Sequence, residues 1–240
     1  MTNSVSNENV PWEGDVPSHR KEQFAEVFVF LFLIVPSLIL SFFVVKQGGM
    51  SFVLIALSSI LRDLALVSLI FFFLWRNGEP FNVIGWKLKN AAKEAILGVW
   101  LFIPFFFGAG LLETGLRTAG FTAPATPLPS LISDKNTMEF LLAAVLVFVV
   151  ALAEETIFRG YLILRFKNVT TSTAAAVMLS AVIFSLGHGY EGSAGVITVG
   201  VMGLFFALIY VWRQSLVAPM VMHFLQDFIG IVLVPLLGMR

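Results

Sequence analysis

The sequence predicts an all-α integral membrane protein, a polytopic bundle of seven to eight transmembrane helices. Two observations lead to this prediction. Of the 240 residues, 58% are hydrophobic and only 12% are charged, with a mean hydropathy of +0.91, which soluble domains of this length do not normally reach. Apolar runs of about 20 residues, the length that crosses roughly 30 Å of hydrocarbon, also follow one another along the chain.

Seven apolar segments are expected to cross the membrane. They cover approximately residues 24–45, 51–75, 91–112, 138–166, 173–188, 194–212 and 215–237. The fourth is too long for a straight span, so we expect it to leave the membrane near Arg165 and Lys167. The seventh contains Pro219, and a break there would give an eighth helical piece. The stretches 76–90 and 121–136 are rich in turn-forming residues and are predicted to be loops.

The chain is predicted to hold one domain, residues 24–240, because no polar linker separates the apolar segments. Residues 1–23 are polar and lack the apolar centre of a signal peptide, so they are predicted to be a disordered tail. The 15 basic and 15 acidic residues balance, so net charge does not indicate a nucleic-acid partner. The absence of cysteine excludes disulfides, thiolate catalysis and zinc–thiolate sites.

The distribution of Lys and Arg predicts the orientation in the membrane. Nine basic residues fall on the N-terminal side of the predicted spans and four fall on the opposite side. An excess of Lys and Arg marks cytoplasmic loops. We therefore expect a multi-pass protein of the cell membrane with a cytoplasmic N-terminus.

Ionisable side chains inside the predicted spans are few. Each costs about 2.5–3.5 kcal/mol at the centre of a bilayer, so such groups usually pair or face a polar cavity. Glu26 lies near a span end and is expected to reach the interface. Arg62 and Asp63 are expected to form an ion pair or to line a cavity. The remaining groups are Glu154, Glu155, Arg159, His188, His223 and Asp227.

Helix geometry separates the two neighbouring glutamates. Glu155 and Arg159 are four residues apart and can pair on one helical face. Glu154 is five residues from Arg159, about 140° around the helix, and has no partner nearby in sequence. Glu154 either finds a partner on another helix and holds the bundle together, or it is a free carboxylate with a chemical role.

Two further spans carry histidines. Phe184 and His188 are four residues apart and share a face, and the predicted helix stops just after His188. His223 and Asp227 are also four residues apart, so both can face the same cavity. A lone membrane histidine is most often a packed core residue. Together with Glu154, however, these side chains make up a general base, a partner for it and a polarising pair on three separate helices.

The stretches EETIFR (154–159), FSLGH (184–188) and HFLQD (223–227) resemble the three signature motifs of the CPBP family, which are EExxxR, FxxxH and Hxxx(N/D). This family comprises the type II CAAX prenyl endopeptidases and bacterial relatives linked to bacteriocin processing or immunity. The resemblance implies an all-helical membrane fold around a water-accessible catalytic cavity, in which a peptide bond is hydrolysed.

The resemblance also implies a role for each motif residue. Glu154 resembles the base that activates water, and His188 resembles its partner. His223 and Asp227 match the pair that stabilises the oxyanion of the tetrahedral intermediate. The positions with a structural or orienting role are Glu155, Arg159 and Phe184.

Asp227 departs from the prenyl endopeptidase branch, which typically has Asn at this position. An ionised aspartate would repel an oxyanion. Asp227 is therefore either protonated, or it accepts a hydrogen bond from His223 and orients the ring. We favour the second role.

Two versions of the chemistry remain open. In one, Glu154 activates water without a metal or other cofactor. In the other, Glu154, His188 and His223 hold a zinc ion with water in the fourth position. The first version is favoured because the sequence contains neither an HExxH motif nor a cysteine.

The predicted function is thus that of an intramembrane endopeptidase of the glutamate type, similar to the CAAX prenyl proteases. The alternatives are a non-catalytic bacteriocin immunity or membrane interaction protein of the same fold, and a proton-coupled transporter, for which the sequence lacks inverted repeats. The expected partners are the lipid bilayer and a peptide or protein substrate, which in the best-known branch is prenylated at its C-terminus. The short chain and Asp227 favour a prokaryotic host.

Overall fold

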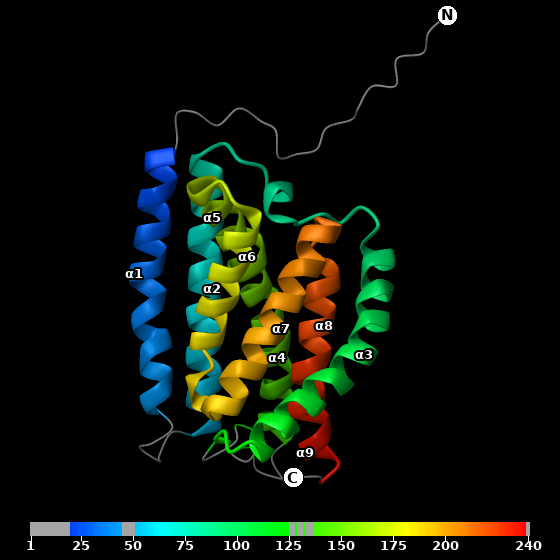
Figure 1. Ribbon diagram of the computed structural model, residues 1–240. Helices are drawn as coiled ribbons and strands as arrows, with labels where there is room; N and C mark the ends of the chain where they lie inside the picture. Colours follow the sequence, from blue (N-terminus) through cyan, green and yellow to red (C-terminus); the bar gives the residue numbers. More distant parts are fainter. Residues whose placement is uncertain (1–19, 45–50, 125–127, 129–131, 133–136, 239–240) are drawn as a thin grey trace, which may run out of the picture.

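The computed structural model describes residues 20–44, 51–124, 128, 132 and 137–238. Within these residues the regular secondary structure is all helical, and seven helical segments form a bundle (Figure 1). The bounds are α1 (Arg20–Val44), α2 (Phe52–Arg76), α3 (Ala91–Thr118), the run α4–η4–α5 (Thr137–Glu154, Glu155–Leu162 and Ile163–Thr170), α6 (Thr173–Leu186), α7 (Gly192–Arg213) and the run α8–η6–α9 (Val217–Asp227, Phe228–Leu233 and Val234–Leu236). Two short 3-10 helices, η2 (Phe81–Ile84) and η5 (Gly189–Glu191), lie in the connections.

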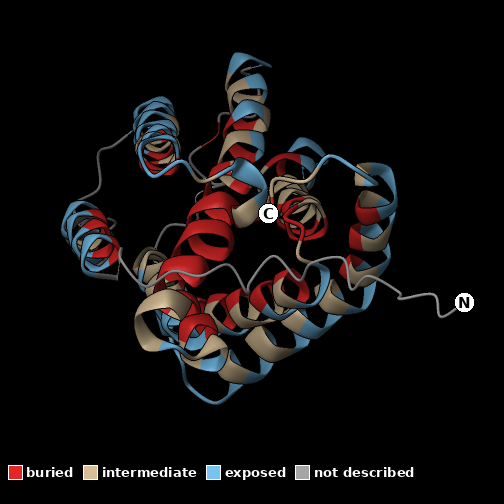
Figure 2. Ribbon diagram, turned by 90° about the horizontal axis from the view of Figure 1, so that it is seen from above, coloured by how far each residue is buried: buried red, intermediate tan, exposed pale blue. Residues whose placement is uncertain are grey.

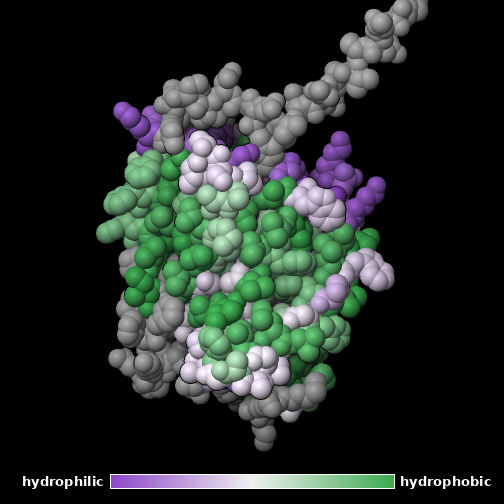
Figure 3. Space-filling model, in the orientation of Figure 1, coloured by the Kyte–Doolittle hydropathy of each residue, from purple (hydrophilic) through white to green (hydrophobic). Residues whose placement is uncertain are grey.

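Five segments in the described part of the chain are long and apolar enough to cross a membrane: α2, α3, α4–η4–α5, the run from η5 through α7, and α8–η6–α9. α6 is shorter, with 14 residues. Figure 3 shows hydrophobic residues over most of the middle of the visible face, where a bilayer would cover them. The predicted multi-pass helical fold is confirmed, but five described segments, rather than seven or eight, meet this criterion.

Pro219 does not break the last segment. It is the third residue of α8, where a backbone N–H would have no partner within the helix, so the missing proline N–H costs little. The segment continues through η6 and α9 to Leu236. The eighth helical piece considered at Pro219 is therefore wrong.

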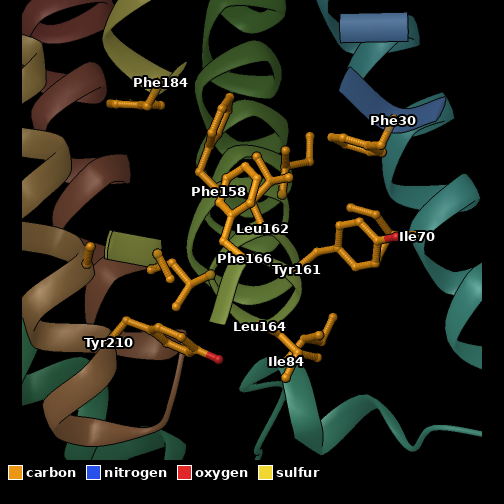
Figure 4. Packing of buried hydrophobic residues seen from close by; sticks show 14 of the residues in the cluster. Phe30, Ile70, Ile84, Phe158, Tyr161, Leu162, Leu164, Phe166, Phe184 and Tyr210 are labelled. Atoms are coloured by element: carbon orange, nitrogen blue, oxygen red, sulfur yellow. The ribbon is translucent and has the colours of Figure 1, made fainter. Parts of the chain in front are cut away.

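The run α4–η4–α5 forms the centre of the bundle. Residues 153–166 are all buried, as expected of a helix that is surrounded on every side. Figure 4 shows Phe158 and Tyr161 of this run packed among residues of other segments, including Phe30 and Tyr210. Figure 2 shows the same arrangement from above, with buried residues on the faces that the helices turn toward one another.

The helix α3 is bent and covers one side of the bundle. It contains Pro104, which lacks a backbone N–H and disturbs the helical hydrogen bonds around it. In Figure 1 the first half of α3 stands beside α8, and its second half slants across the lower part of the bundle. Gly98 allows the first half to approach α8, since a Cβ there would lie 2.8 Å from the carbonyl oxygen of Ala218. This course brings the second half of α3 over the ends of α6, α7 and α8.

A buried ionic network joins α1, α2 and α5. Arg76 Nη2 donates to Glu26 Oε1 at 2.5 Å, and Tyr161 donates its hydroxyl proton to Glu26 Oε2 at 3.2 Å. Arg165 Nε lies 3.3 Å from Glu26 Oε2, and its guanidinium pairs with both carboxylate oxygens of Glu79. Glu26 is only 3% exposed. Arginines from two other segments neutralise its carboxylate, and its position at the interface stays a prediction.

The predicted boundaries agree with the structure to within a few residues where they can be compared. α1 begins at Arg20, before the boundary expected at residue 23, and the rest of the predicted tail lies outside the described residues. The predicted loop 76–90 contains η2, and most of the predicted loop 121–136 lies outside the described residues. α6 ends at Leu186, two residues before the expected end at His188.

We predict that Gly160→Ala lowers the apparent melting temperature of the purified protein by several degrees. A Cβ at Gly160 would lie 2.7 Å from the carbonyl oxygen of Ile84 and 3.2 Å from its Cβ, so η2 would have to move. Overpacking of this kind costs about 1–3 kcal/mol. Gly108→Ala is the matched control, because no heavy atom lies within 4 Å of a Cβ there. Equal melting temperatures for the two variants in detergent would contradict the predicted contact.

Candidate active site

The three sequence motifs lie on neighbouring segments of the bundle. EETIFR spans the end of α4 and the start of η4, FSLGH spans the end of α6, and HFLQD lies in α8. η4 is a π-helix, a form that occurs mostly as short stretches and frequently at functional sites. The motif glutamates therefore stand at the point where the central helix changes its winding.

Glu155 is the most deeply buried acidic group of the site, at 0% exposure. Its Oε1 accepts a hydrogen bond from Arg159 Nη1 at 2.8 Å, as the spacing of four residues predicted. The same oxygen lies 2.8 Å from Nδ1 of His223 on α8. One carboxylate oxygen thus joins two of the three motifs.

Arg159 is held in place from several sides. Its guanidinium carbon lies 4.1 Å from the centre of the Phe184 ring, within the range of a cation–π contact. Its Nη2 lies 3.5 Å from the carbonyl oxygen of Gly203 on α7. Gly203 has no room for a side chain, because a Cβ there would lie 2.9 Å from Phe184. Phe184, which the sequence placed among the orienting residues, contacts Arg159 and packs against His188 with 4.8 Å between ring centres.

His223 is 4% exposed and faces three carboxylates. Its Nδ1 is hydrogen-bonded to Glu155 Oε1. Its Nε2 lies 3.4 Å from Asp227 Oδ2 and 3.7 Å from Glu154 Oε2. A carboxylate can only accept a hydrogen bond when ionised, so the contact with Glu155 assigns the proton on that side to Nδ1. The predicted proximity of His223 and Asp227 is present, but the shortest contact of the ring is with Glu155.

Glu154 occupies the end of α4 without a hydrogen-bonding partner for Oε2, which is buried. The nearby ion pair between Arg62 and Asp63 on α2 is formed, with 2.9 Å between Arg62 Nε and Asp63 Oδ1. Asp63 is 1% exposed, and the charge of Glu154 acts on it. Among the described residues, the ionic contact recorded for Glu154 is with His223, whose Nε2 lies 3.7 Å from its Oε2.

His188 lies on a different wall of the site. Its Nδ1 is 3.0 Å from the carbonyl oxygen of Phe184, and because a carbonyl oxygen only accepts, Nδ1 is the donor. In the neutral ring, Nε2 is then the acceptor. Among the described residues, no contact joins His188 to Glu154, so the structure does not bring these two side chains together directly.

A cavity of about 540 Å³ lies beside this cluster. His188, His223 and Asp227 line it, together with Phe184 and residues from the second half of α3 and the first half of α7. Glu154 does not line the cavity. Its Oε2 lies 3.7 Å from Nε2 of His223, and His223 does line the cavity. The volume is in the range of sites that hold small ligands or short peptide segments.

The arrangement does not fit the zinc site that the sequence left open. Within the described ranges, no group of three or more His, Asp or Glu side chains is placed to hold a metal ion. Among the described residues, no contact brings His188 to Glu154, with which it would have to share the metal. We therefore derive no step through a metal.

Five polar residues of the cavity were missed in the sequence. They are Glu113, Thr114, Glu191, Thr198 and Gln226. Glu113 and Glu191 lie just outside the predicted spans, where a charge is usually a solvated loop residue. Thr198 and Gln226 are neutral side chains in apolar runs and gave no signal of their own.

Comparison with families of known proteins finds a match within the C-terminal part of the chain. Residues 136–229 match the family of Rce1-like type II CAAX prenyl endopeptidases. No curated protein and no solved structure matches the chain. The matched residues contain all three motifs and each of the side chains that meet at Glu155. Residues 136–229 of this membrane protein therefore form a domain of the Rce1-like type II CAAX prenyl endopeptidase family.

Proposed function

We propose that this protein is an intramembrane endopeptidase in which Glu154 activates the attacking water. The observation that carries the proposal is the meeting of Glu154, Glu155, His223 and Asp227 in one buried cluster beside a cavity, inside the segment that matches an endopeptidase family. The role of Glu154 as the base is supported by its Oε2, which is buried and has no hydrogen-bonding partner among the described residues.

Glu154 and the substrate exchange one proton in the proposed reaction. Glu154 takes a proton from water, the resulting hydroxide attacks the peptide carbonyl carbon, and an oxyanion forms. When the C–N bond breaks, Glu154 returns the proton to the leaving amine. General acid–base catalysis of this kind contributes about 10²- to 10⁴-fold.

His223 is proposed to stabilise the oxyanion from the cavity side. Glu155 holds Nδ1, so Nε2 is the ring atom turned toward Glu154, Asp227 and the cavity. Nε2 can donate to an oxyanion when it carries a proton, and carboxylates on both sides can hold that proton in the cluster. His188 lines the same cavity and can supply a second polar contact to the substrate or to the water. One such donor is typically worth about 3–4 kcal/mol of barrier.

Glu155 and Arg159 are proposed to position His223 rather than to react. Arg159 neutralises Glu155 in the buried interior, and Phe184 and Gly203 fix Arg159. Before the oxyanion forms, Asp227, at 3.4 Å from Nε2, is proposed to accept from this ring nitrogen and limit the rotation of the ring. The chain then holds the ring in one orientation while the cavity exchanges substrate and product.

We expect Glu154→Gln to lower the hydrolysis rate by about 10²- to 10⁴-fold, because an amide cannot accept the proton of water. The assay compares a farnesylated CaaX peptide with its unprenylated twin, both incubated with detergent-purified protein. Glu139→Gln, which removes a carboxylate at the start of α4 outside the cavity lining, serves as the control. A parallel series with chelator tests metal dependence. Full activity in Glu154→Gln would overturn the proposed role.

Arg159→Lys is expected to reduce kcat about tenfold or more while leaving KM within about threefold. Lysine keeps the charge but loses the planar contact with Phe184 and the geometry that fixes Glu155. A purely structural role would lower the amount of folded protein instead, so the melting temperature is measured alongside. An unchanged kcat in a stable Arg159→Lys protein would argue against positioning through Glu155.

For Asp227→Asn we predict activity within about tenfold of the unaltered protein, since an amide oxygen can still accept from His223 and the amide nitrogen can donate to an oxyanion. The measurement is kcat on the same peptides. Complete loss of activity would rule out any role that an amide can fill and would require the charge of Asp227.

A further inference from the structure

The charged side chains that line the cavity are all acidic, apart from the two histidines. They are Glu113, Glu191 and Asp227, and no Lys or Arg is found among the described lining residues. Glu113 Oε1 is shared with Arg117 at 2.5 Å, in a pair that is partly exposed. The cavity lining therefore offers three carboxylates and, in the part of the chain that the structure describes, no lysine or arginine to cover them.

Glu191 is held by the local backbone. It directly precedes α7 as its N-cap, and its N–H donates to the carbonyl oxygen of His188 at 2.9 Å. Gly195, one turn later, leaves the space that this side chain fills, since a Cβ there would lie 2.4 Å from Glu191 Cβ and 3.0 Å from its Oε2. The absence of a side chain at Gly195 thus leaves room for the carboxylate of Glu191, and both residues line the cavity.

Two further polar atoms of the lining lack partners. Thr198 is 5% exposed, and its Oγ1 is buried without a hydrogen bond. The Oε1 of Gln226 is likewise buried and without a partner. A buried polar atom left unpaired costs about 1–3 kcal/mol, so both positions favour a ligand that can pair with them. Gln226 Oε1 only accepts, like the carboxylates around it, and the Thr198 hydroxyl can accept as well as donate.

The chemistry of the lining selects one kind of ligand. Arginine carries five N–H donors and lysine three, and neither side chain has an acceptor. Their methylene stems can lie along apolar walls such as Phe106, Met202 and Phe206 while the charged end reaches the carboxylates. A free carboxylate, in contrast, would meet the like charges of Glu113, Glu191 and Asp227.

We propose that this cavity binds an arginine or lysine side chain of the peptide substrate close to the cleaved bond, with Glu191 as its main partner and Thr198 and Gln226 as further acceptors. The inference rests on the proposed protease function, because it names the substrate feature that the same cavity selects.

The experiment measures peptide binding without turnover. The probe is a labelled, C-terminally amidated apolar heptapeptide with one central arginine, compared with its twin that carries uncharged citrulline, which has nearly the same shape. Binding to the full-length Glu154→Gln protein in detergent is followed by fluorescence anisotropy. We expect the arginine peptide to bind about tenfold more tightly or better, because charge-assisted hydrogen bonds are roughly twice as strong as neutral ones.

The added substitutions identify the partner. Glu191→Gln is expected to reduce the preference for arginine to below about threefold, and Thr198→Val to weaken arginine binding while preserving the shape of the wall. Glu22→Gln, in the first turn of α1, is the matched control and should retain the full preference. Equal binding of the two peptides, binding of neither, or a preference that survives Glu191→Gln would overturn the proposal.

Cleavage of the arginine peptide by the unaltered protein is measured in parallel by mass spectrometry. This second readout separates the two proposals. A preference for arginine in binding without any cleavage would contradict the proposed protease function and support the cation subsite. Cleavage that depends on Glu154 but not on the arginine would support the protease function and contradict the cation subsite.

Discussion

The buried carboxylate of Glu155 is the group on which the candidate site depends. Its Oε1 accepts hydrogen bonds from Arg159 Nη1 and from His223 Nδ1, each at 2.8 Å. The second of these bonds joins η4 to α8. An unpaired charge at this depth would be costly, so neither partner can be removed without exposing the other to that cost. The orientation of the His223 ring, the rotation of α8 and the packing of Phe184 against Arg159 all follow from this one contact.

The position of this contact follows from the way the bundle is assembled. Residues 153–166 are buried on all sides, so any charge on them must be satisfied by neighbouring segments rather than by water. Gly203 and Gly160 keep the neighbours close, since each lacks room for a Cβ. The bend of α3 at Pro104 then brings a polar stretch across the ends of α6, α7 and α8, and a cavity remains between them.

The sequence predicted what lies within one helix better than what lies between helices. The pairs Glu155–Arg159 and His223–Asp227 were found because a spacing of four residues fixes their relative position on a helix. The contact between Glu155 and His223 joins residues 68 positions apart, and no local pattern encodes the rotation of one helix against another. The arginine partners of Glu26 were not predicted for the same reason, because they lie on other segments.

Other differences arise from features that a hydropathy pattern does not contain. The π-helical turn at Glu155 has no marker in the residue types of EETIFR, and Pro219 signals a break only if the helix begins well before it. Glu191 lies between two predicted spans, where a solvated loop was the ordinary interpretation. Its place in the cavity depends on the 3-10 turn of η5 and on the space above Gly195, which appear only in three dimensions.

Two groups of buried charges differ in how completely they are paired, and this difference separates a structural role from a chemical one. In the network at α1, α2 and α5, every carboxylate oxygen of Glu26 and Glu79 has a hydrogen-bonding partner. Arg165 Nε makes no hydrogen bond but lies 3.3 Å from Glu26 Oε2, an opposite charge. In the cluster near the cavity, Glu154 Oε2 and Glu155 Oε2 are buried without hydrogen bonds, as are the oxygens of Thr198 and Gln226. Unpaired acceptors are unfavourable in an apolar interior unless water or substrate reaches them. Their concentration beside one cavity is therefore the physical reason to place the chemistry there rather than in the equally charged network nearer the start of α1.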